Sequence, residues 1–299
     1  MVKIDLHMHS AYSQDGEHTP QELARIAARE QIGVLALTDH NSVRGVKEMI
    51  AAGKAAGIRV IPAIELDCLF AGYEPHLIGY GIDPDLPAFA AVEAHVEAEE
   101  RRIAAERLDL IAGLGMRVHR KALLAKMDGV VTGEDIAEDV LTNPENDGRE
   151  DLLPYRPGGR RADNPLVNFY WDYCAVGKPA FVPMRYLSLA QAVDLVRRAG
   201  GVPVLAHPGQ TFAGQETALL TRALALGIWG IEAYSSYHTP QVSRMLCDFA
   251  AEQGLIVTCG SDFHGKIKPA IHMGGHGAPQ AGQLLRALET KIRLARTEQ

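Results

Sequence analysis

Short apolar runs that end in polar residues recur along the chain and alternate with stretches of helical periodicity. Val34–Thr38 is apolar up to its last residue, as expected for a strand buried on both faces of a sheet. Most runs are followed by a helical pattern, which is typical of a parallel sheet covered by helices. Comparable runs predict strands at Val2–Leu6, Arg59–Ile64, 74–80, Val202–Ala206, Ile228–Ala233 and Leu255–Gly260.

The clearest helix start follows the first strand. Thr19 can cap the helix, Pro20 takes its first position, and Glu22 lies three residues after the cap, which completes a capping box. Ser42, Ser188 and Thr239 precede similar patterns. We therefore expect helices over residues 20–32, 42–56, 188–199, 216–226, 239–254 and 280–296.

The strand–helix alternation breaks between residues 86 and 187. Leu86–Met116 is a long helical stretch, and shorter helices are expected at 120–127 and 132–141. Residues 142–187 are rich in proline, glycine, arginine and aromatic residues, and the aromatics favour an ordered insertion over a disordered one. We therefore predict one barrel domain from residues 1–85 and 188–299, with 86–187 as a cap over its carboxyl face.

Composition limits the alternatives for function. The chain has 299 residues, 47% of them hydrophobic, and a formal charge of −7, which argues against a general nucleic-acid-binding surface. No apolar run reaches membrane-spanning length and no signal peptide is evident. We expect a cytoplasmic protein with no membrane association and no stable nucleic-acid partner, and the oligomeric state stays open. The cysteines lack a CxxC pair and are expected to be reduced, mostly core thiols: Cys68, Cys174, Cys247 and Cys259.

Residues that can bind metals follow nearly every predicted strand. His7 and His9 lie two apart at the end of the first strand, so their side chains point the same way and can share one ion. Alone, such a pair is more often solvent-facing than functional. Strand ends converge on one face of a barrel, however, and active sites form there. The nine-residue set comprises six histidines and three carboxylates: His7, His9, Asp15, His40, Glu65, His76, His207, Asp262 and His264.

Nine ligands exceed what one ion needs. Mixed imidazole and carboxylate ligands suit manganese, zinc or iron, and two or three divalent ions would use the set fully. We expect manganese, with zinc or iron(II) as alternatives. Clustered ions of this kind hold a hydroxide at neutral pH and clamp a phosphoryl group for in-line attack. The other histidines are interpreted as surface or hydrogen-bonding residues: His18, His95, His119, His238, His272 and His276.

The order and spacing of these motifs resemble those of the PHP phosphoesterase family. That family is similar to the amidohydrolases and includes histidinol phosphate phosphatase and polymerase-associated PHP domains. The resemblance covers residues 1–80 and 188–270. It rests on His7-Met8-His9, Asp15, Thr38-Asp39-His40, Glu65, His76, Ala206-His207-Pro208 and Ser261-Asp262-Phe263-His264.

The resemblance implies an α/β fold, a distorted (β/α)7 barrel with a mainly helical insertion, and a three-metal site. Glu65 would bridge the first two ions. Asp15, His207 and His264 are the candidates for a catalytic role. The implied ligands are His7, His9, Glu65 and Asp262 for the first ion, Glu65, His76 and His207 for the second, and Asp15, His40 and His264 for the third.

The insertion resembles that of a small-molecule branch of the family. This branch contains phosphatases of nucleoside 3',5'-bisphosphates, 5'-exonucleases of RNA or oligonucleotides, and a phosphodiesterase that opens a cyclic ribose phosphate. Known nucleotidase members carry a Gly-Arg-x-His-like segment where this chain has Gly133-Glu134-Asp135-Ile136.

A basic cluster in the insertion suggests a second phosphate site. Arginine binds phosphate oxygens through paired hydrogen bonds, so such a site would favour substrates with two phosphates. The alternative is a solvated loop with surface ion pairs. The expected substrate-binding residues are Arg156, Arg160, Arg161, Lys178 and Arg185.

The leading hypothesis is a metal-dependent phosphoesterase acting on a small phosphorylated metabolite. A nucleoside 3',5'-bisphosphate or a cyclic ribose phosphate is the expected type of substrate. Alternatives are a 5'-exonuclease of RNA or oligonucleotides, a non-catalytic PHP module and a C–N hydrolase of amidohydrolase type. A degenerate module would be expected to lose ligands, whereas all nine positions are filled here.

Overall fold

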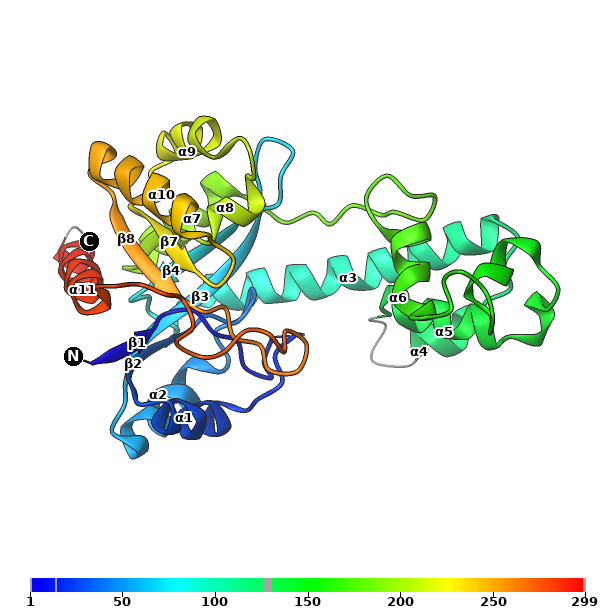
Figure 1. Cartoon of the computed structure of the whole chain (residues 1–299), viewed down its shortest axis with the longest axis horizontal. Helices are drawn as coiled ribbons and strands as arrows, with labels where there is room; N and C mark the ends of the chain where they lie inside the picture. The colour runs from blue at the N-terminus through cyan, green and yellow to red at the C-terminus, as the bar shows by residue number, and fades with distance from the viewer. Residues whose placement is uncertain (1, 14, 126–130, 298–299) are drawn as a thin grey trace. The chain divides into compact units, whose positions relative to one another are not determined.

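The structure is a computed structural model that describes residues 2–13, 15–125 and 131–297 (Figure 1). The chain forms two compact units, each with its own core. The first comprises Met1–Glu93 and Tyr186–Gln299, and the second comprises Ala94–Arg185. The predicted boundaries at 86 and 188, and the placement of the insertion as a cap, stay predictions.

The first unit contains a nearly closed α/β barrel, as predicted. Its last strand returns to its first, because the amide of Leu6 donates to the carbonyl of Cys259 at 3.2 Å. A short β5 (Leu187–Ser188) pairs with the end of β3, off the main path. Neighbouring strands follow the order β1 (Lys3–Asp5), β2 (Ile32–Leu37), β3 (Arg59–Leu69), β4 (His76–Tyr80), β6 (Val202–Leu205), β7 (Gly230–Ser235) and β8 (Ile256–Gly260).

The sheet is parallel, as predicted, except at β4, which is antiparallel to both β3 and β6. β3 continues to Leu69 and turns back, so Asp67 pairs with His76. His76 therefore begins its strand instead of ending it, and Glu65 lies within β3. The reversal still brings His76 beside Ala206, whose amide donates to the His76 carbonyl at 2.9 Å.

Helices cover the outside of the sheet (Figure 1). In α1 the predicted capping box is present, with reciprocal bonds between Thr19 and Glu22. α2 begins later than predicted, after Gly45, and Ser42 does not cap it. The covering helices are α1 (Pro20–Arg29), α2 (Val46–Ala56), α7 (Leu189–Arg198), α8 (Pro208–Thr211), α9 (Glu216–Leu224), α10 (Pro240–Gln253) and α11 (Ala281–Thr297).

The barrel core is built from alternate strand residues and α11. Ile4, Ala63, Ile78 and Val204 belong to one buried cluster that also contains Leu288 of α11. Burying an aliphatic side chain of this size contributes roughly 1.5–3 kcal/mol. Such a core gives the rigid support that a site assembled from several strand ends requires.

The second unit is mainly helical, as predicted. Its buried core includes Leu108, Ile136, Val140 and Phe169. No helix in the described part of the chain is long and apolar enough to cross a membrane. The second unit is entered through the long helix α3 (Pro87–Gly113). Its further elements are α4 (Arg120–Ala125), α5 (Gly133–Thr142), η2 (Pro144–Asn146), η3 (Glu150–Tyr155), α6 (Pro165–Phe169) and η4 (Tyr170–Cys174).

Candidate metal centre

The fold brings the whole nine-residue set together at one end of the barrel strands. Its members form overlapping groups whose ligand atoms lie within 4.8 Å of one another. These groups contain the three predicted ligand sets, with His9 also lying close to the third. They are His7, His9, Glu65 and Asp262; Glu65, His76 and His207; and His9, Asp15, His40 and His264.

The first group is completely enclosed. Glu65 Oε2 lies 3.0 Å from His7 Nε2 and 3.1 Å from His9 Nε2. Asp262 Oδ1 lies 2.9 Å from His9 Nε2 and 3.2 Å from His7 Nε2. Two imidazole nitrogens and two carboxylate oxygens thus converge from the loops after β1 and β8 and from the middle of β3.

Glu65 joins this group to the second. Its other oxygen, Oε1, lies 3.0 Å from His76 Nδ1 and 3.3 Å from His207 Nε2. Each oxygen of one carboxylate therefore faces a separate pair of imidazoles. This is the arrangement expected of a carboxylate that bridges two ions.

The third group reaches solvent through Asp15, whose side chain is 36% exposed. Asp15 Oδ2 lies 2.9 Å from His264 Nε2 and 3.8 Å from His40 Nε2. The ring of His9 stacks on both histidines, with centroid distances of 4.1 Å to His264 and 4.5 Å to His40. The third group is therefore the most accessible part of the set.

Asp67 is a further candidate ligand that the sequence analysis missed. Its Oδ1 lies 2.8 Å from His40 Nδ1 and 3.5 Å from His76 Nε2. Its Oδ2 accepts a hydrogen bond from Asn41 Nδ2 at 2.7 Å. Asp67 follows Glu65 by two residues on β3, so the alternation rule that paired His7 with His9 could have identified it.

Glu232, on β7, was also not assigned to the site. It is buried, and its Oε1 lies 3.0 Å from His7 Nδ1 while Oε2 accepts from the amide of His207 at 3.0 Å. A carboxylate on the far nitrogen of an imidazole fixes the ring and its tautomer. Glu232 therefore directs His7 Nε2 toward Glu65 and holds the strand end at His207.

Two buried aspartates support the loops that carry the histidines. Asp39 accepts bonds from the amide and hydroxyl of Ser10, at 2.6 and 2.8 Å. Asp5 does the same for Ser261, at 2.9 and 2.6 Å. The loops that follow β1 and β8 are therefore anchored next to His9 and Asp262.

Backbone strain is concentrated at the site. Asn41, His207 and Asp262 have φ angles of 54°, 23° and 60°, in a region that residues other than glycine rarely adopt. Gly260 permits the close approach of β8 to β1, because a Cβ there would lie 2.1 Å from His7 Cβ. The surrounding packing therefore holds these residues in backbone conformations that their residue types rarely adopt.

The charges of the set favour ionised carboxylates. Burial raises the pKa of Glu65, but His7, His76 and His40 outweigh it and hold that pKa well below its usual range. Burial lowers the pKa of His40, but Asp67 and Glu65 raise it to about 10. The pKa of His207 is lowered, chiefly by burial. Protons held on such imidazoles must leave before a cation can bind.

The residues fit a divalent metal cluster in two respects: the chemistry of their ligand atoms, and the presence of buried polar atoms that lack a hydrogen-bond partner in the described part of the chain. Asp15 Oδ1 and His207 Nδ1 are buried and have no hydrogen-bond partner among the described residues. Buried polar atoms are ordinarily paired, so such atoms indicate a missing partner. Imidazole nitrogens with carboxylate oxygens are the ligands that manganese, iron(II) and zinc accept.

The predicted phosphate-binding residues of the insertion all lie in the second unit. Arg161 makes two bonds to Asp172, at 2.9 and 2.7 Å, and Tyr155 donates to the same carboxylate at 2.7 Å. Arg156 lies 3.1 Å from Asp147. Arg185 lies 3.9 Å from Glu99. These ion pairs agree with the alternative of a solvated loop for three of the five residues. A phosphate-binding role for Arg156, Arg160, Arg161, Lys178 and Arg185 stays a prediction.

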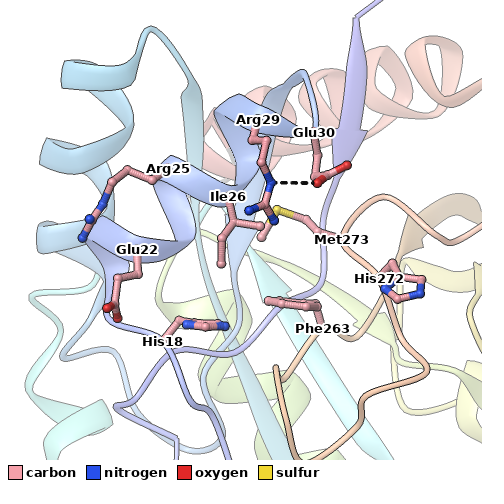
Figure 2. A pocket seen from close by; sticks show the side chains of 9 residues that line it. All are labelled: His18, Glu22, Arg25, Ile26, Arg29, Glu30, Phe263, His272 and Met273. Carbon is pink, nitrogen blue, oxygen red and sulfur yellow. Dashed lines mark hydrogen bonds and ion pairs between the residues drawn. The ribbon is translucent and has the colours of Figure 1, made fainter.

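A separate cavity of about 560 Å³ lies between α1 and the loop that follows β8 (Figure 2). Phe263, between Asp262 and His264, lines it together with His18 and Met273. The rings of His18 and Phe263 are nearly parallel, at 5°, with centroids 5.8 Å apart. His18 therefore belongs to the lining of this cavity and not to the nine-residue set.

The chain as a whole is similar to several known proteins. The family model of the PHP domain matches residues 5–128. A 3',5'-nucleoside bisphosphate phosphatase from Chromobacterium violaceum is 32% identical over 268 residues, which are 88% of each chain. A solved structure from the same organism, described as an amidohydrolase with bound sulfate, has a TM-score of 0.74 at 27% identity and covers 97% of each chain.

Two other relatives have different named activities. A 5'-3' exoribonuclease from Haemophilus influenzae is 29% identical, covering 88% of this chain and 90% of the relative. A phosphoribosyl 1,2-cyclic phosphate 1,2-diphosphodiesterase from Eggerthella lenta is 27% identical, covering 90% of this chain and 97% of the relative. All three named activities break a phosphate ester bond.

Proposed function

Because the chain belongs to the PHP family of metal-dependent phosphoesterases, we propose that it hydrolyses a small phosphorylated metabolite of the nucleoside 3',5'-bisphosphate or cyclic ribose phosphate type. The chain is a hydrolase of phosphate esters, the reaction class shared by its named relatives. The finer choice of substrate is supported by the names of the bisphosphate phosphatase and the cyclic phosphodiesterase.

Two or three divalent ions, manganese first and zinc or iron(II) as alternatives, would be held by the nine-residue set. The single observation that carries this proposal is that the two carboxylate oxygens of Glu65 face different pairs of histidines. One oxygen lies toward His7 and His9, and the other lies toward His76 and His207. When bound, such ions supply a hydroxide at neutral pH and neutralise charge on the phosphoryl group.

The chain's own residues orient the site. Glu232 fixes the ring of His7, so that its Nε2 faces Glu65 and Asp262. Asp15 is an anion at neutral pH, because contacts with His264 and His40 outweigh the effect of burial and lower its pKa. With its exposed side chain it lies where a substrate can reach the set. Asp15, His207 and His264 are therefore the proposed catalytic residues.

An exonuclease acting on the 5' end of RNA is the second candidate, favoured by the exoribonuclease relative. That activity also breaks a phosphate ester, so the same metal residues would serve it. The two candidates differ in the length of the substrate that must fit next to the site. A stable nucleic-acid partner is not part of either proposal, and neither includes a membrane.

A substrate panel tests the proposal. Purified protein with manganese would be given adenosine 3',5'-bisphosphate, phosphoribosyl 1,2-cyclic phosphate, a 5'-phosphorylated oligoribonucleotide and an aryl phosphate. The proposal expects kcat/KM to be highest for one of the first two and to vanish with a chelator. Preference for the oligoribonucleotide would support the exonuclease instead. Hydrolysis that survives complete metal removal would contradict both.

A further inference from the structure

The carboxylate of Asp262 has two differently occupied oxygens. Oδ1 faces His9 and His7, within the proposed metal site. Oδ2 accepts a hydrogen bond from Lys268 Nζ at 2.9 Å and another from the hydroxyl of Tyr237. Asp262 therefore links the nine-residue set to a lysine and a tyrosine outside that set.

Lys268 is held firmly for a lysine. It lies in the loop after β8, and Tyr237 lies between β7 and α10. Besides Asp262, Lys268 Nζ donates to the Tyr237 hydroxyl at 2.9 Å and lies 5.5 Å from the centroid of that ring. The Tyr237 ring in turn packs edge-on against His207, with centroids 5.6 Å apart. The ammonium is thus fixed relative to ligands of two proposed ions.

The charge of Lys268 is unusual for this site. Among the ion pairs of the described residues, its contact with Asp262 is the one that joins a lysine or arginine to the nine-residue set. The Lys268 side chain is 33% exposed, whereas that of Asp262 is 4% exposed. An ammonium carries three protons, and Asp262 and Tyr237 account for two. One N–H therefore remains to bind an acceptor that arrives from solvent.

We propose that Lys268 binds an oxygen of the substrate phosphoryl group, with Tyr237 as the residue that positions its ammonium. This inference rests on the proposed function, since it assumes that a phosphoryl group is bound at the nine-residue set. A phosphoryl group is an anion, and lysine binds phosphate as a compact point charge. A fixed ammonium next to the proposed ions would hold that group in position without side-chain rearrangement.

A purely structural role would have different consequences. If Lys268 only held the carboxylate of Asp262 in position, its removal would weaken metal binding and leave the intrinsic affinity for phosphate unchanged. Metal content and phosphate affinity must therefore be measured separately. Lys266 gives a matched control, because it is in the same loop, its side chain is 89% exposed, and it pairs with Glu17 outside the site.

The experiment is calorimetric titration of inorganic phosphate into manganese-loaded protein, with bound manganese quantified by elemental analysis. For Lys268→Met we expect phosphate affinity to fall about tenfold or more at unchanged manganese content. Lys268→Arg, which keeps the charge, should retain most of the affinity, and Lys266→Met should match the unchanged protein. Tyr237→Phe should give an intermediate loss, because the lysine keeps its bond to Asp262.

Several results would overturn the inference. They are unchanged phosphate affinity in Lys268→Met, an equal loss in Lys266→Met, loss of manganese that accounts for the whole effect, and no phosphate binding by the unchanged protein. If Lys268→Met does not fold, the phosphate affinities of Lys268→Arg and Tyr237→Phe are compared instead. A greater loss of phosphate affinity in Lys268→Arg than in Tyr237→Phe would refute the charge-based role. The substrate panel tests the proposed function separately. If the protein hydrolyses the substrates but Lys268→Met leaves phosphate affinity unchanged, only this inference is refuted. If phosphate binding depends on Lys268 but no substrate is hydrolysed, only the proposed function is refuted.

Discussion

Glu65 on β3 and His76 at the start of β4 face each other across an antiparallel strand pair, with Oε1 3.0 Å from Nδ1. Oε2 of the same carboxylate faces His7 and His9. One side chain therefore contacts two groups of candidate ligands, and its removal should affect both groups together.

Glu65→Gln should lose bound metal and hydrolytic activity in parallel. The amide keeps the shape of the side chain but removes the charge and one of two acceptor oxygens. Elemental analysis and kcat/KM on the same preparation would measure both effects. Glu252→Gln, at an exposed position on α10, is the matched control and should change neither. Full retention of metal and rate by Glu65→Gln would refute the bridging role.

Glu232→Gln should weaken metal binding while the protein stays folded. The change removes the negatively charged carboxylate that lies beside His7 Nδ1, and it disturbs the orientation of that ring. Loss of such a supporting carboxylate typically costs about 10- to 100-fold in metal affinity. Titration with manganese measures the effect, and Glu252→Gln on the surface of α10 serves as the control. Equal affinities in the two variants would show that Glu232 has only a packing role.

Metal occupancy should fall as the pH drops. The pKa values of His7, His9 and His40 are raised despite burial, chiefly by Glu65 for His7, by Asp262 for His9 and by Asp67 for His40. Protons therefore compete with cations for these nitrogens even at neutral pH. Dialysis against fixed manganese from pH 8 to pH 5, followed by elemental analysis, measures the trend. Constant occupancy over this range would count against histidine ligation.

The same shifts predict the opposite trend for the stability of the metal-free protein. A histidine whose pKa is raised on folding stabilises the fold fully below its unfolded pKa of about 6.5, and this contribution is lost as the pH rises toward the folded value. For His40 that value is about 10. Chelator-treated protein should therefore have a lower Tm at pH 9 than at pH 7. A higher Tm at pH 9 would show that these histidines are not protonated in the folded protein.

Arg160→Ala tests the basic cluster of the insertion. If the cluster binds a second phosphate, kcat/KM for a doubly phosphorylated substrate should fall about tenfold or more, while hydrolysis of an aryl phosphate changes little. Arg161 is less informative because Asp172 already binds it, so Arg161→Ala would also disturb the insertion. Equal losses on both substrates, or none on either, would remove Arg160 from substrate recognition.

Much of the fold could be predicted from local signals. The capping box of Thr19 and Glu22 placed α1 correctly, and apolar runs located the barrel strands within a few residues. The direction of β4 could not be predicted in this way, because apolar residues alternate alike in parallel and antiparallel strands. The start of α2 was placed too early because Ser42 resembles a cap, whereas its hydroxyl accepts from the amide of Arg44 before the helix begins.

Some residues of the candidate site could likewise be predicted from local sequence signals, and others could not. Candidate ligands next to strand ends were identifiable, because residue type and position together point to metal chemistry. Glu232 and Tyr237 were not identifiable, because each contacts a residue far away in the sequence: Glu232 contacts His7, and Tyr237 contacts Asp262. Lys268 follows Asp262 by six residues, but in an irregular loop that spacing does not indicate that the ammonium returns to the carboxylate. Asp67 could have been found from its spacing to Glu65 alone.

Anomalous diffraction from a crystal of the protein grown with manganese would show directly whether Glu65 bridges two ions. We predict at least two anomalous peaks within the nine-residue set, with Glu65 lying between them and one carboxylate oxygen toward each. Asp15, His40 and His264 should surround a further peak if a third ion is present. A single peak away from Glu65, or no peak near these residues in a crystal whose protein is active with manganese, would refute the bridged metal centre.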